Sequence, residues 1–561
     1  MKKWAVWATG GWLLAISVAQ AADGATAAKP KAYAVASAHP LATQAGLEVL
    51  AAGGNAFDAA VAVSAAIAVV EPTGSGLGGG GFWLLHRQSD GFETMVDGRE
   101  KAPGKSSPEM YLDASGKAVD KRSRDGALSA GIPGEPAALD HIARQYGKLP
   151  LSRSLEPAIR YARDGFACDD KLAAAFARSW KRLSPAAKAT FAVAGQPPGS
   201  GALLKQPDLA RTLERMAAKG RAGFYEGETA RLLLAGSTQD GGIWTQADLD
   251  GYEVVERKPV TFFYRDYRIV TASPPSAAGP TLGEVLHQLE LLGYDGKGVA
   301  AKHQLIEAMR RGYRDRAAYL GDPDFVQIPM TQLLSRSYAE SLVAGIDRNK
   351  ATPSTALPPA PPYWEGNNTT HLSILDADGN RVAATLSINL SFGSAYMAPG
   401  TGVFFNDEMD DFAASVTASN AYGLIGSKAN LVAPGKRPLS SMSPTFVEGP
   451  RGLLIVGSPG GSRIVTMVLL GLLDWIGGAD AKQVVTSPRL HHQYLPDIVE
   501  YEPGAVSPQE LTQLQAMGHV LKPVEAMYGN LQAVTWDPKT GKIEAAADPR
   551  GVGEGKVVPL K

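Results

Sequence analysis

The distribution of apolar residues predicts a largely helical first part of the chain. Residues 40–54 and 55–72 read as two helices, and the second is apolar on all sides, so we expect it to be buried. Residues 130–235 also read mainly as helices. A strand-like stretch at 258–273 then precedes a further helix from Thr281 to Leu292.

The pattern changes after residues 350–363, KATPSTALPPAPPY, which are rich in proline and lack periodicity. This segment is predicted to be an exposed linker or the end of a subunit. Beyond it, strands are predicted at 370–376, 381–388, 402–406 and 444–457, and helices at 464–476 and 507–517. Blocks of helices and strands with hairpins in the middle favour an α+β fold.

The composition excludes few functions but argues against one class of partner. The 561 residues carry Lys+Arg 55 against Asp+Glu 56, a balance that gives no support to nucleic-acid binding. The single cysteine, Cys168, cannot form an intramolecular disulfide. Two acidic residues follow it and should raise the pKa of its thiol, so we interpret it as structural.

The first residues resemble a secretory signal peptide. Two lysines precede a short apolar run, and Ala19-Gln20-Ala21 has the small-x-small form of a cleavage site. We therefore expect residues 1–21 to be removed, the mature chain to begin near Ala22, and the protein to be periplasmic or secreted, without a membrane span. The alternative is an uncleaved membrane anchor.

The sequence gives only weak support to a nucleotide-binding or metal-binding site. Gly74, Gly76 and Gly79 match G-x-G-x-x-G, but a helix precedes them and a strand follows, the reverse of a dinucleotide site. We expect these glycines to allow a close approach of backbone segments instead. The histidines are scattered, without H-E-x-x-H, so no metal site is predicted, and no G-x-S-x-G elbow is present.

The strongest chemical signal is a hairpin at residues 365–393. The turn sequence DADGN should fold residues 386–389 back beside 369–371, which gathers Thr369, Ser387 and Asn389. No side-chain base with an acid behind it accompanies them. A threonine can instead be activated by its own α-amine if it is the first residue of a chain. That would require cleavage of the bond between Asn368 and Thr369.

Eight motifs in order make the chain similar to the γ-glutamyltransferase (γ-glutamyl transpeptidase) family of N-terminal nucleophile hydrolases. They are SGLGGGGF (75–82), DGREKAP (97–103), TTHLSILDADGN (369–380), NDEMDDF (406–412), KRPLSSMSPT (436–445), GSPGGSR (457–463), SPRLHHQYLPD (487–497) and DPR (548–550). The resemblance implies a four-layer αββα sandwich. It would be built jointly by a large chain, 22–368, and a small chain, 369–561, which form a heterodimer after self-cleavage of a zymogen.

The resemblance also implies roles for individual residues. Thr369 falls on the nucleophile, Gly460 and Gly461 on the backbone donors to the oxyanion, and Ser387 on a supporting position that is usually threonine. The positions that hold the α-ammonium of the substrate are Asn389, Glu408 and Asp411, and those for its α-carboxylate are Arg99, Ser440 and Ser441. Tyr422 falls on the covering tyrosine of a lid loop at 415–427. A γ-glutamyl group ends in a zwitterion, which suits acids paired with a forked guanidinium.

We therefore expect an exported γ-glutamyltransferase with glutathione hydrolase activity. It would transfer the γ-glutamyl group to water or to amino acid or dipeptide acceptors, without a cofactor or metal. Two alternatives remain open. One is a relative that acts on glutaryl groups, as a cephalosporin acylase does. The other is an uncleaved, inactive homologue that serves as a binding protein.

Overall fold

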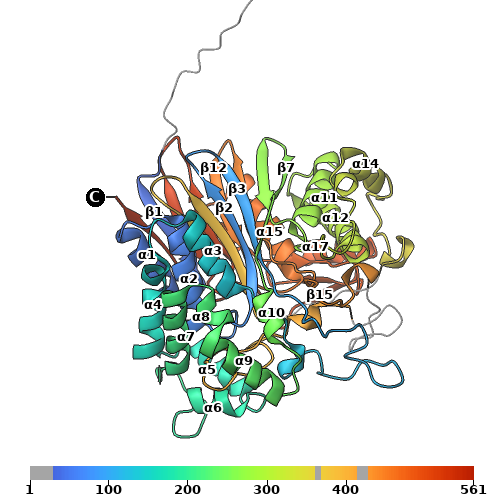
Figure 1. The fold of residues 1–561 in the computed structure, drawn as a ribbon. Coiled ribbons are helices and arrows are strands. Elements are labelled where there is room, and N and C mark those ends of the chain that lie inside the picture. Colours follow the sequence, from blue (N-terminus) through green and yellow to red (C-terminus); the bar gives the residue numbers. More distant parts are fainter. Residues whose placement is uncertain (1–28, 361–367, 414–426, 561) are drawn as a thin grey trace, which may run out of the picture.

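The structure is a computed structural model that describes residues 29–360, 368–413 and 427–560 (Figure 1). Residues 1–21, the expected signal peptide, and Tyr422 lie outside the described residues. Within the described ranges, no helix combines the length and apolar character needed to cross a bilayer.

Two β-sheets form the centre of the protein. The seven-stranded sheet has the order β18-β1-β9-β10-β2-β3-β6, and the six-stranded sheet has the order β17-β16-β12-β11-β8-β7. The strands of the first are β1 (Ala32–Ser37), β2 (Gly80–Arg87), β3 (Phe92–Gly98), β6 (Val255–Arg257), β9 (Thr370–Leu375), β10 (Arg381–Ser387) and β18 (Glu554–Pro559). Those of the second are β7 (Val260–Tyr264), β8 (Tyr267–Thr271), β11 (Thr445–Gly449), β12 (Gly452–Gly457), β16 (Gln532–Trp536) and β17 (Ile543–Ala547).

The remaining strands form two smaller sheets. One pairs β4 (Phe166–Ala167) with β5 (Leu203–Leu204), and the other joins β13 (Leu490–His491), β14 (Val499–Tyr501) and β15 (Leu521–Pro523).

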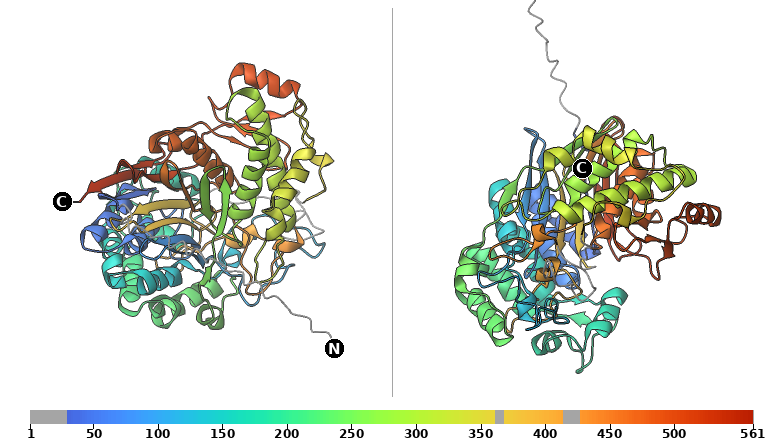
Figure 2. Two further views of the ribbon diagram at one scale, coloured as in Figure 1. Left: turned by 90° about the horizontal axis from the view of Figure 1, so that it is seen from above. Right: turned by 90° about the vertical axis from the view of Figure 1, so that its right-hand side faces the viewer.

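The helices gather in two groups on opposite sides of the sheets (Figures 1 and 2). The first group is α1 (Pro40–Ala51), α2 (Ala56–Val70), α3 (Glu135–Tyr146), α4 (Leu151–Asp164), α5 (Asp170–Ser179), α6 (Pro185–Phe191), α7 (Pro207–Lys219), α8 (Ala222–Tyr225), α9 (Gly227–Gln239) and α10 (Gln246–Asp250). The second is α11 (Ala278–Leu291), α12 (Gly298–Tyr319), α13 (Met330–Leu333), α14 (Arg336–Ala344), α15 (Arg463–Ile476), α16 (Ala481–Thr486) and α17 (Pro508–Ala516). Short 3₁₀ turns are η1 (Ala127–Ser129), η2 (Ser354–Ala356), η3 (Glu408–Asp411) and η4 (Lys428–Asn430).

The alternation of side chains along the strands divides the core in two. In β2, Trp83 and Leu85 join the apolar cluster that includes α2, whereas Phe82 and Leu84 join the cluster that includes β12 and α15. Helix α2 packs on β9 and β10, and the same two strands contact β12 of the other sheet. The seven-stranded sheet is therefore covered by helices on one face and by the second sheet on the other.

The hairpin prediction is confirmed. Strands β9 and β10 pair antiparallel, with Arg381 opposite Leu375 and Leu386 opposite Thr370. Both helices predicted at 40–72 and the helices near 464–476 and 507–517 are also present, and the strand predicted at 444–457 is a pair of strands, β11 and β12. The register places the end of β10 beside the residue that precedes β9, which is Thr369.

One prediction from the sequence is wrong. Residues 402–406 form no strand, only an isolated bridge between Met397 and Phe404. In the proline-rich segment, the described residues up to 360 are exposed or half-buried except for Ala351 and Ser354, which are buried. The segment is bound to the long helix α12, whose Arg310 donates to Ser354 Oγ at 2.6 Å and whose Arg314 donates to Pro358 O at 2.9 Å.

The glycine run at 74–81 brings backbone segments together, as the sequence predicts. A Cβ atom at Gly79 would lie 2.1 Å from the carbonyl oxygen of Ser387, and one at Gly81 would lie 2.4 Å from that of Thr385. Since these atoms belong to the backbone of β10, they have little freedom to move away. The absence of side chains here lets β2 approach the strand that carries Ser387.

We predict that Gly79→Ala destabilises the protein, because its methyl group would overlap the backbone of β10. The free energy of unfolding should fall by about 1–3 kcal/mol, measured by urea denaturation. Gly76→Ala is the matched control, because a Cβ at Gly76 would meet nothing within 4 Å. Equal stability of the two variants would contradict the close approach.

Candidate active site

A chain of hydrogen bonds links Thr369 to the peptide bond that precedes it. Thr369 Oγ1 donates to Ser387 Oγ at 3.4 Å, and Ser387 Oγ donates to the carbonyl oxygen of Asn368 at 3.1 Å. The N–H of Asn389 also donates to Ser387 Oγ, at 2.8 Å. The Ser387 hydroxyl thus accepts from the candidate nucleophile and polarises the carbonyl that the nucleophile would attack.

The residue after Thr369 faces the helices of the first group. Thr370 Oγ1 donates to Glu71 Oε2 at 2.8 Å, and Glu71 directly follows α2. Burial raises the pKa of Glu71 to about 7, although Lys171 and the bond from Thr370 oppose the shift. Sequence reasoning did not identify Glu71, because its place beside Thr370 depends on how α2 packs under β9.

His371, two residues after Thr369, is a core residue and not a base. Its ring nitrogens bond to Thr385 Oγ1 at 2.8 Å and to Ser373 Oγ at 3.1 Å. Burial lowers the pKa of His371 to about 3, so the ring is neutral. Its Cε1 lies 2.3 Å from where a Cβ of Gly457 would stand. Because side chains alternate along a strand, the loop that begins at Gly457 lies on the Thr369 side of β9.

That loop presents two backbone N–H groups at the start of α15. Gly460 and Gly461 adopt positive φ values of 134° and 60°, and their carbonyls accept from Arg463 and Ile464. Throughout the described ranges, neither of the two glycine N–H groups donates to a protein atom. Free N–H groups at a helix N-terminus favour negative charge, as on an oxyanion.

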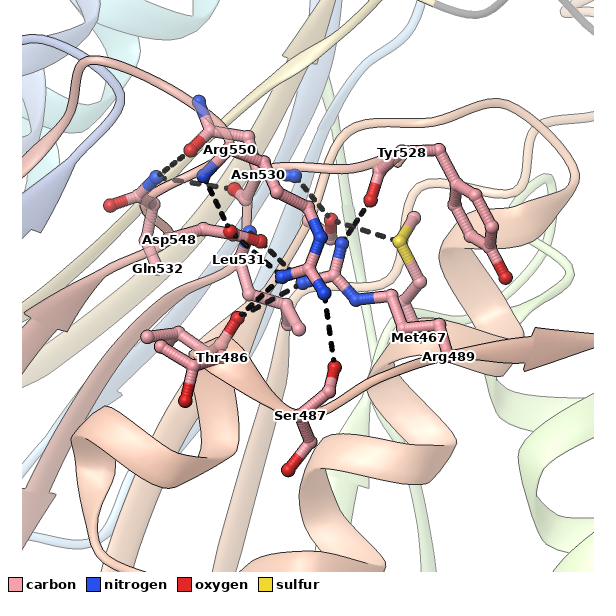
Figure 3. Close-up of polar contacts among 12 residues, drawn as sticks. Met467, Thr486, Ser487, Arg489, Tyr528, Asn530, Leu531, Gln532, Asp548 and Arg550 are labelled. Carbon is pink, nitrogen blue, oxygen red and sulfur yellow. Dashed lines mark hydrogen bonds and ion pairs between the residues drawn. The ribbon is translucent and has the colours of Figure 1, made fainter. Parts of the chain in front are cut away.

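A polar network that includes Arg489, Asn530 and Asp548 is connected to this loop (Figure 3). The N–H of Asn530 donates to Ser458 Oγ at 3.3 Å, and that of Leu531 to Asp548 Oδ2 at 3.1 Å. Asp548 in turn pairs with Arg489. The network therefore joins the motifs GSPGGSR, SPRLHHQYLPD and DPR, which are far apart in the sequence.

Arg99 is buried between two acids. Its Nη1 lies 2.5 Å from Glu408 Oε2, and its Nη2 lies 2.5 Å from Asp411 Oδ2. Burial alone would lower the pKa of Arg99, but Glu408, Glu100 and Asp411 more than offset this and hold it well above its usual value. The cation and the anions predicted for the two ends of a zwitterion are thus in direct contact with each other.

Hydrogen bonds join this charged cluster to the Thr369 hairpin. Asn389 Nδ2 donates to the carbonyl oxygen of Asp407 at 2.9 Å, which fixes the orientation of the Asn389 amide. The N–H of Asp407 donates to Ile388 O at 3.2 Å, and Asp407 directly precedes η3, which contains Glu408 and Asp411. The acids are therefore held one short segment away from Ser387.

The two predicted carboxylate-binding serines lie next to Arg99. Arg99 donates to the carbonyl oxygens of Pro438 at 3.2 Å and Leu439 at 3.3 Å, just before Ser440 and Ser441. Both serines are buried. Sequence reasoning missed Arg316 of α12, which donates to Ser441 Oγ at 2.8 Å.

Two groups of side chains have the spacing of metal ligands, His303 with Glu307 and His519, and His86 with Glu93 and Glu448. Their carboxylates already pair with arginines: Glu307 with Arg310 and Arg311, and Glu93 and Glu448 with Arg268. Both groups are thus explained as internal ion-pair networks, and neither includes a predicted site residue.

Comparisons with known proteins place the chain in a family. The family model described as Gamma-glutamyltranspeptidase matches residues 42–558. A "Glutathione hydrolase proenzyme" of Pseudomonas sp. (strain A14) is 44% identical over 495 residues, which cover 86% of this chain and 85% of that protein.

Solved structures show a similar α+β fold. A cephalosporin acylase from Bacillus halodurans has a TM-score of 0.83 at 28% identity, covering 94% of this chain and 96% of its own. A chain of Helicobacter pylori gamma-glutamyltranspeptidase has a TM-score of 0.55 at 39% identity, covering 57% of this chain and 93% of its own. The family model spans most of the sequence and the relative is matched over most of both lengths, so the chain belongs to the gamma-glutamyltranspeptidase family.

Proposed function

We propose that this protein is a γ-glutamyltransferase with glutathione hydrolase activity that is made as a proenzyme. Its family and its "Glutathione hydrolase proenzyme" relative support the activity. The observation that carries the mechanism is the path from Thr369 Oγ1 through Ser387 Oγ to the carbonyl oxygen of Asn368.

Maturation begins with attack of Thr369 Oγ1 on the carbonyl carbon of Asn368. The Ser387 hydroxyl polarises that carbonyl and lies within reach of the proton that Thr369 loses. The peptide C–N bond breaks as an ester forms, and the departing nitrogen takes up the proton that Oγ1 has lost, so the α-amine of Thr369 becomes free. Water then cleaves the ester, which leaves Asn368 with a carboxylate and Thr369 as the first residue of the small chain.

The same hydroxyl next acts on substrate. The α-amine of Thr369 takes the hydroxyl proton, and Oγ1 attacks the γ-carbonyl carbon of glutathione. The N–H groups of Gly460 and Gly461 stabilise the oxyanion, a contribution of about 3–4 kcal/mol per donor in comparable sites. Cysteinylglycine leaves with a proton from the α-ammonium group. Water or an acceptor amine then releases the γ-glutamyl group.

The charged cluster supplies recognition of the glutamyl zwitterion. Asn389, Glu408 and Asp411 hold the α-ammonium, while Arg99, Ser440 and Ser441 hold the α-carboxylate. Because Arg99 is paired with both acids, binding of a zwitterion replaces these internal ion pairs. The α-carboxylate of the substrate then pairs with Arg99, and its α-ammonium pairs with the acids. A ligand with only one of the two charges would leave a buried charge without its partner.

The proposed chains would remain intertwined after cleavage. Strands β1, β2, β3 and β6 precede residue 369, but they share one sheet with β9, β10 and β18, which follow it. We infer that the two sheets and two helical groups form the four-layer αββα sandwich of N-terminal nucleophile hydrolases, shared by chains 22–368 and 369–561. Residues 1–21 would direct export to the periplasm or the medium.

The similar cephalosporin acylase fold makes glutaryl substrates the second candidate. A glutaryl group lacks the α-ammonium, so it would have no use for Asp411 and Glu408. The presence of both acids, held against Arg99, favours the glutamyl substrate.

Thr369→Ala should abolish self-cleavage and activity together, because it removes the attacking oxygen. Intact mass measurement should then find one chain, whereas the normal protein yields two that separate at residue 369. Thr370→Ala, the same change one residue later, should still split, because Thr370 points to Glu71. A Thr369→Ala protein that matures would exclude Thr369 from its role, and a normal protein that never splits would favour a binding homologue.

Ser387→Ala should slow self-cleavage by roughly tenfold to a hundredfold, the effect of losing one buried hydrogen bond in a transition state. The rate is measured from the appearance of the small chain on a denaturing gel. Ser387→Thr keeps the hydroxyl and should cleave at a rate close to that of the normal protein. Unchanged cleavage in Ser387→Ala would show that the bond to Asn368 O plays no part.

The normal enzyme should hydrolyse γ-glutamyl-p-nitroanilide with a kcat/KM at least about tenfold higher than glutaryl-p-nitroanilide, since only the former fills the ammonium position. Asp411→Asn should reduce this ratio. Faster hydrolysis of the glutaryl compound would favour the acylase function instead.

A further inference from the structure

Several hydrogen bonds to main-chain atoms fix the backbone around Ser440 and Ser441. The N–H of Ser440 donates to Pro275 O at 2.9 Å, and its carbonyl accepts from Ala277 N at 2.7 Å. Ser443 Oγ donates to the carbonyl oxygen of Ser441 at 2.7 Å. These bonds tie the segment to the residues that lead into α11, so the two hydroxyl groups project from a rigid base.

Both hydroxyl groups act as acceptors within the protein. Ser440 Oγ accepts from the N–H of Met442 at 3.2 Å, and Ser441 Oγ accepts from Arg316 Nη2 at 2.8 Å. Across the described part of the chain, neither hydroxyl donates to a protein atom. A guanidinium has no acceptor atom, so the proton of Ser441 cannot point to Arg316 and is available to an anion.

Arg316 and Arg99 contact different residues of this segment. It belongs to α12, which packs against α11 in the second helical group (Figure 1). Its side chain is 1% exposed, and it contacts Ser441 through the side-chain oxygen. Arg99 instead bonds to the carbonyl oxygens of Pro438 and Leu439. The two guanidinium groups therefore hold different atoms of one short segment.

We propose that Arg316 is a positioning residue that sets the specificity of the site for a carboxylate on the acyl group. By donating to Ser441 Oγ, it directs the hydroxyl proton toward the α-carboxylate of the substrate and adds positive potential behind it. Arg316 does not touch the substrate itself. This inference rests on the proposed γ-glutamyl specificity and adds a residue to the carboxylate end of that site.

The test compares two substrates that differ only in the carboxylate, γ-glutamyl-p-nitroanilide and 4-aminobutyryl-p-nitroanilide. Arg316→Met removes the donor while keeping an unbranched side chain. It should raise KM for the glutamyl compound roughly tenfold, or about 1.4 kcal/mol, with little change in kcat. The kcat/KM for the aminobutyryl compound should stay within about twofold. Arg316→Lys should recover part of the loss, because it keeps one charged donor.

Arg314→Gln is the matched control, since Arg314 lies on the same helix but bonds to Pro358 O and Asp315. Its ratio of the two kcat/KM values should equal that of the normal enzyme. Equal losses on both substrates in the Arg316 variants, or no loss, would overturn the inference. If Arg316→Met does not mature, Arg316→Lys is judged by the same ratio. Failure of the normal enzyme to hydrolyse the glutamyl compound would instead contradict the proposed function.

Discussion

The structure depends first on the register of one hairpin. Because Leu386 lies opposite Thr370, the next residue of β10, Ser387, meets Thr369 where β9 begins. A shift of one residue would turn every side chain of β10 to the other face of the sheet. The same register lets the Ser387 hydroxyl bond to both Thr369 Oγ1 and the carbonyl oxygen of Asn368.

Packing around the hairpin keeps this register. On one side, β2 approaches β10 at glycine residues, where the carbonyl oxygens of β10 leave no room for a Cβ atom. On the other face, the neutral ring of His371 fills the space beside Gly457. The hairpin is therefore held between α2 and the second sheet, and the loop that carries Gly460 and Gly461 is set relative to β9 by direct contact. Preorganised donors of this kind stabilise developing charge without further rearrangement.

The charged part of the site follows a different principle. Arg99 is buried, and its charge is balanced by Glu408 and Asp411 from a segment about three hundred residues later in the chain. Burial of one charge without the other would be costly, so the buried position of Arg99 depends on the two acids. The resulting cluster has both signs of charge at close range, which suits a small zwitterion better than a singly charged ligand. Arg316 and Arg99 both donate hydrogen bonds to the segment at 438–441.

Local patterns were enough to predict much of this protein. The turn sequence at 376–380 specified the hairpin, the apolar run at 55–72 specified a buried helix, and the ordered motifs specified the family, because each signal lies within a short stretch. Prediction failed where contacts with distant segments determine the local structure. Residues 402–406 form no strand, and the hydrogen bonds from α12 to the proline-rich segment have no counterpart in any local pattern.

The sequence by itself determined which residues supply hydroxyl groups and charges, and where consecutive glycines supply unhindered N–H groups. It also determined which hydroxyl groups a turn brings together. Only the tertiary structure decided that Arg99 pairs with Glu408 and Asp411. It also decided that Glu71 accepts a hydrogen bond from Thr370 and that Arg316 donates one to Ser441. The physical reason is that these contacts join helices and loops of different layers. Their distances depend on how the layers pack, and no local pattern records that.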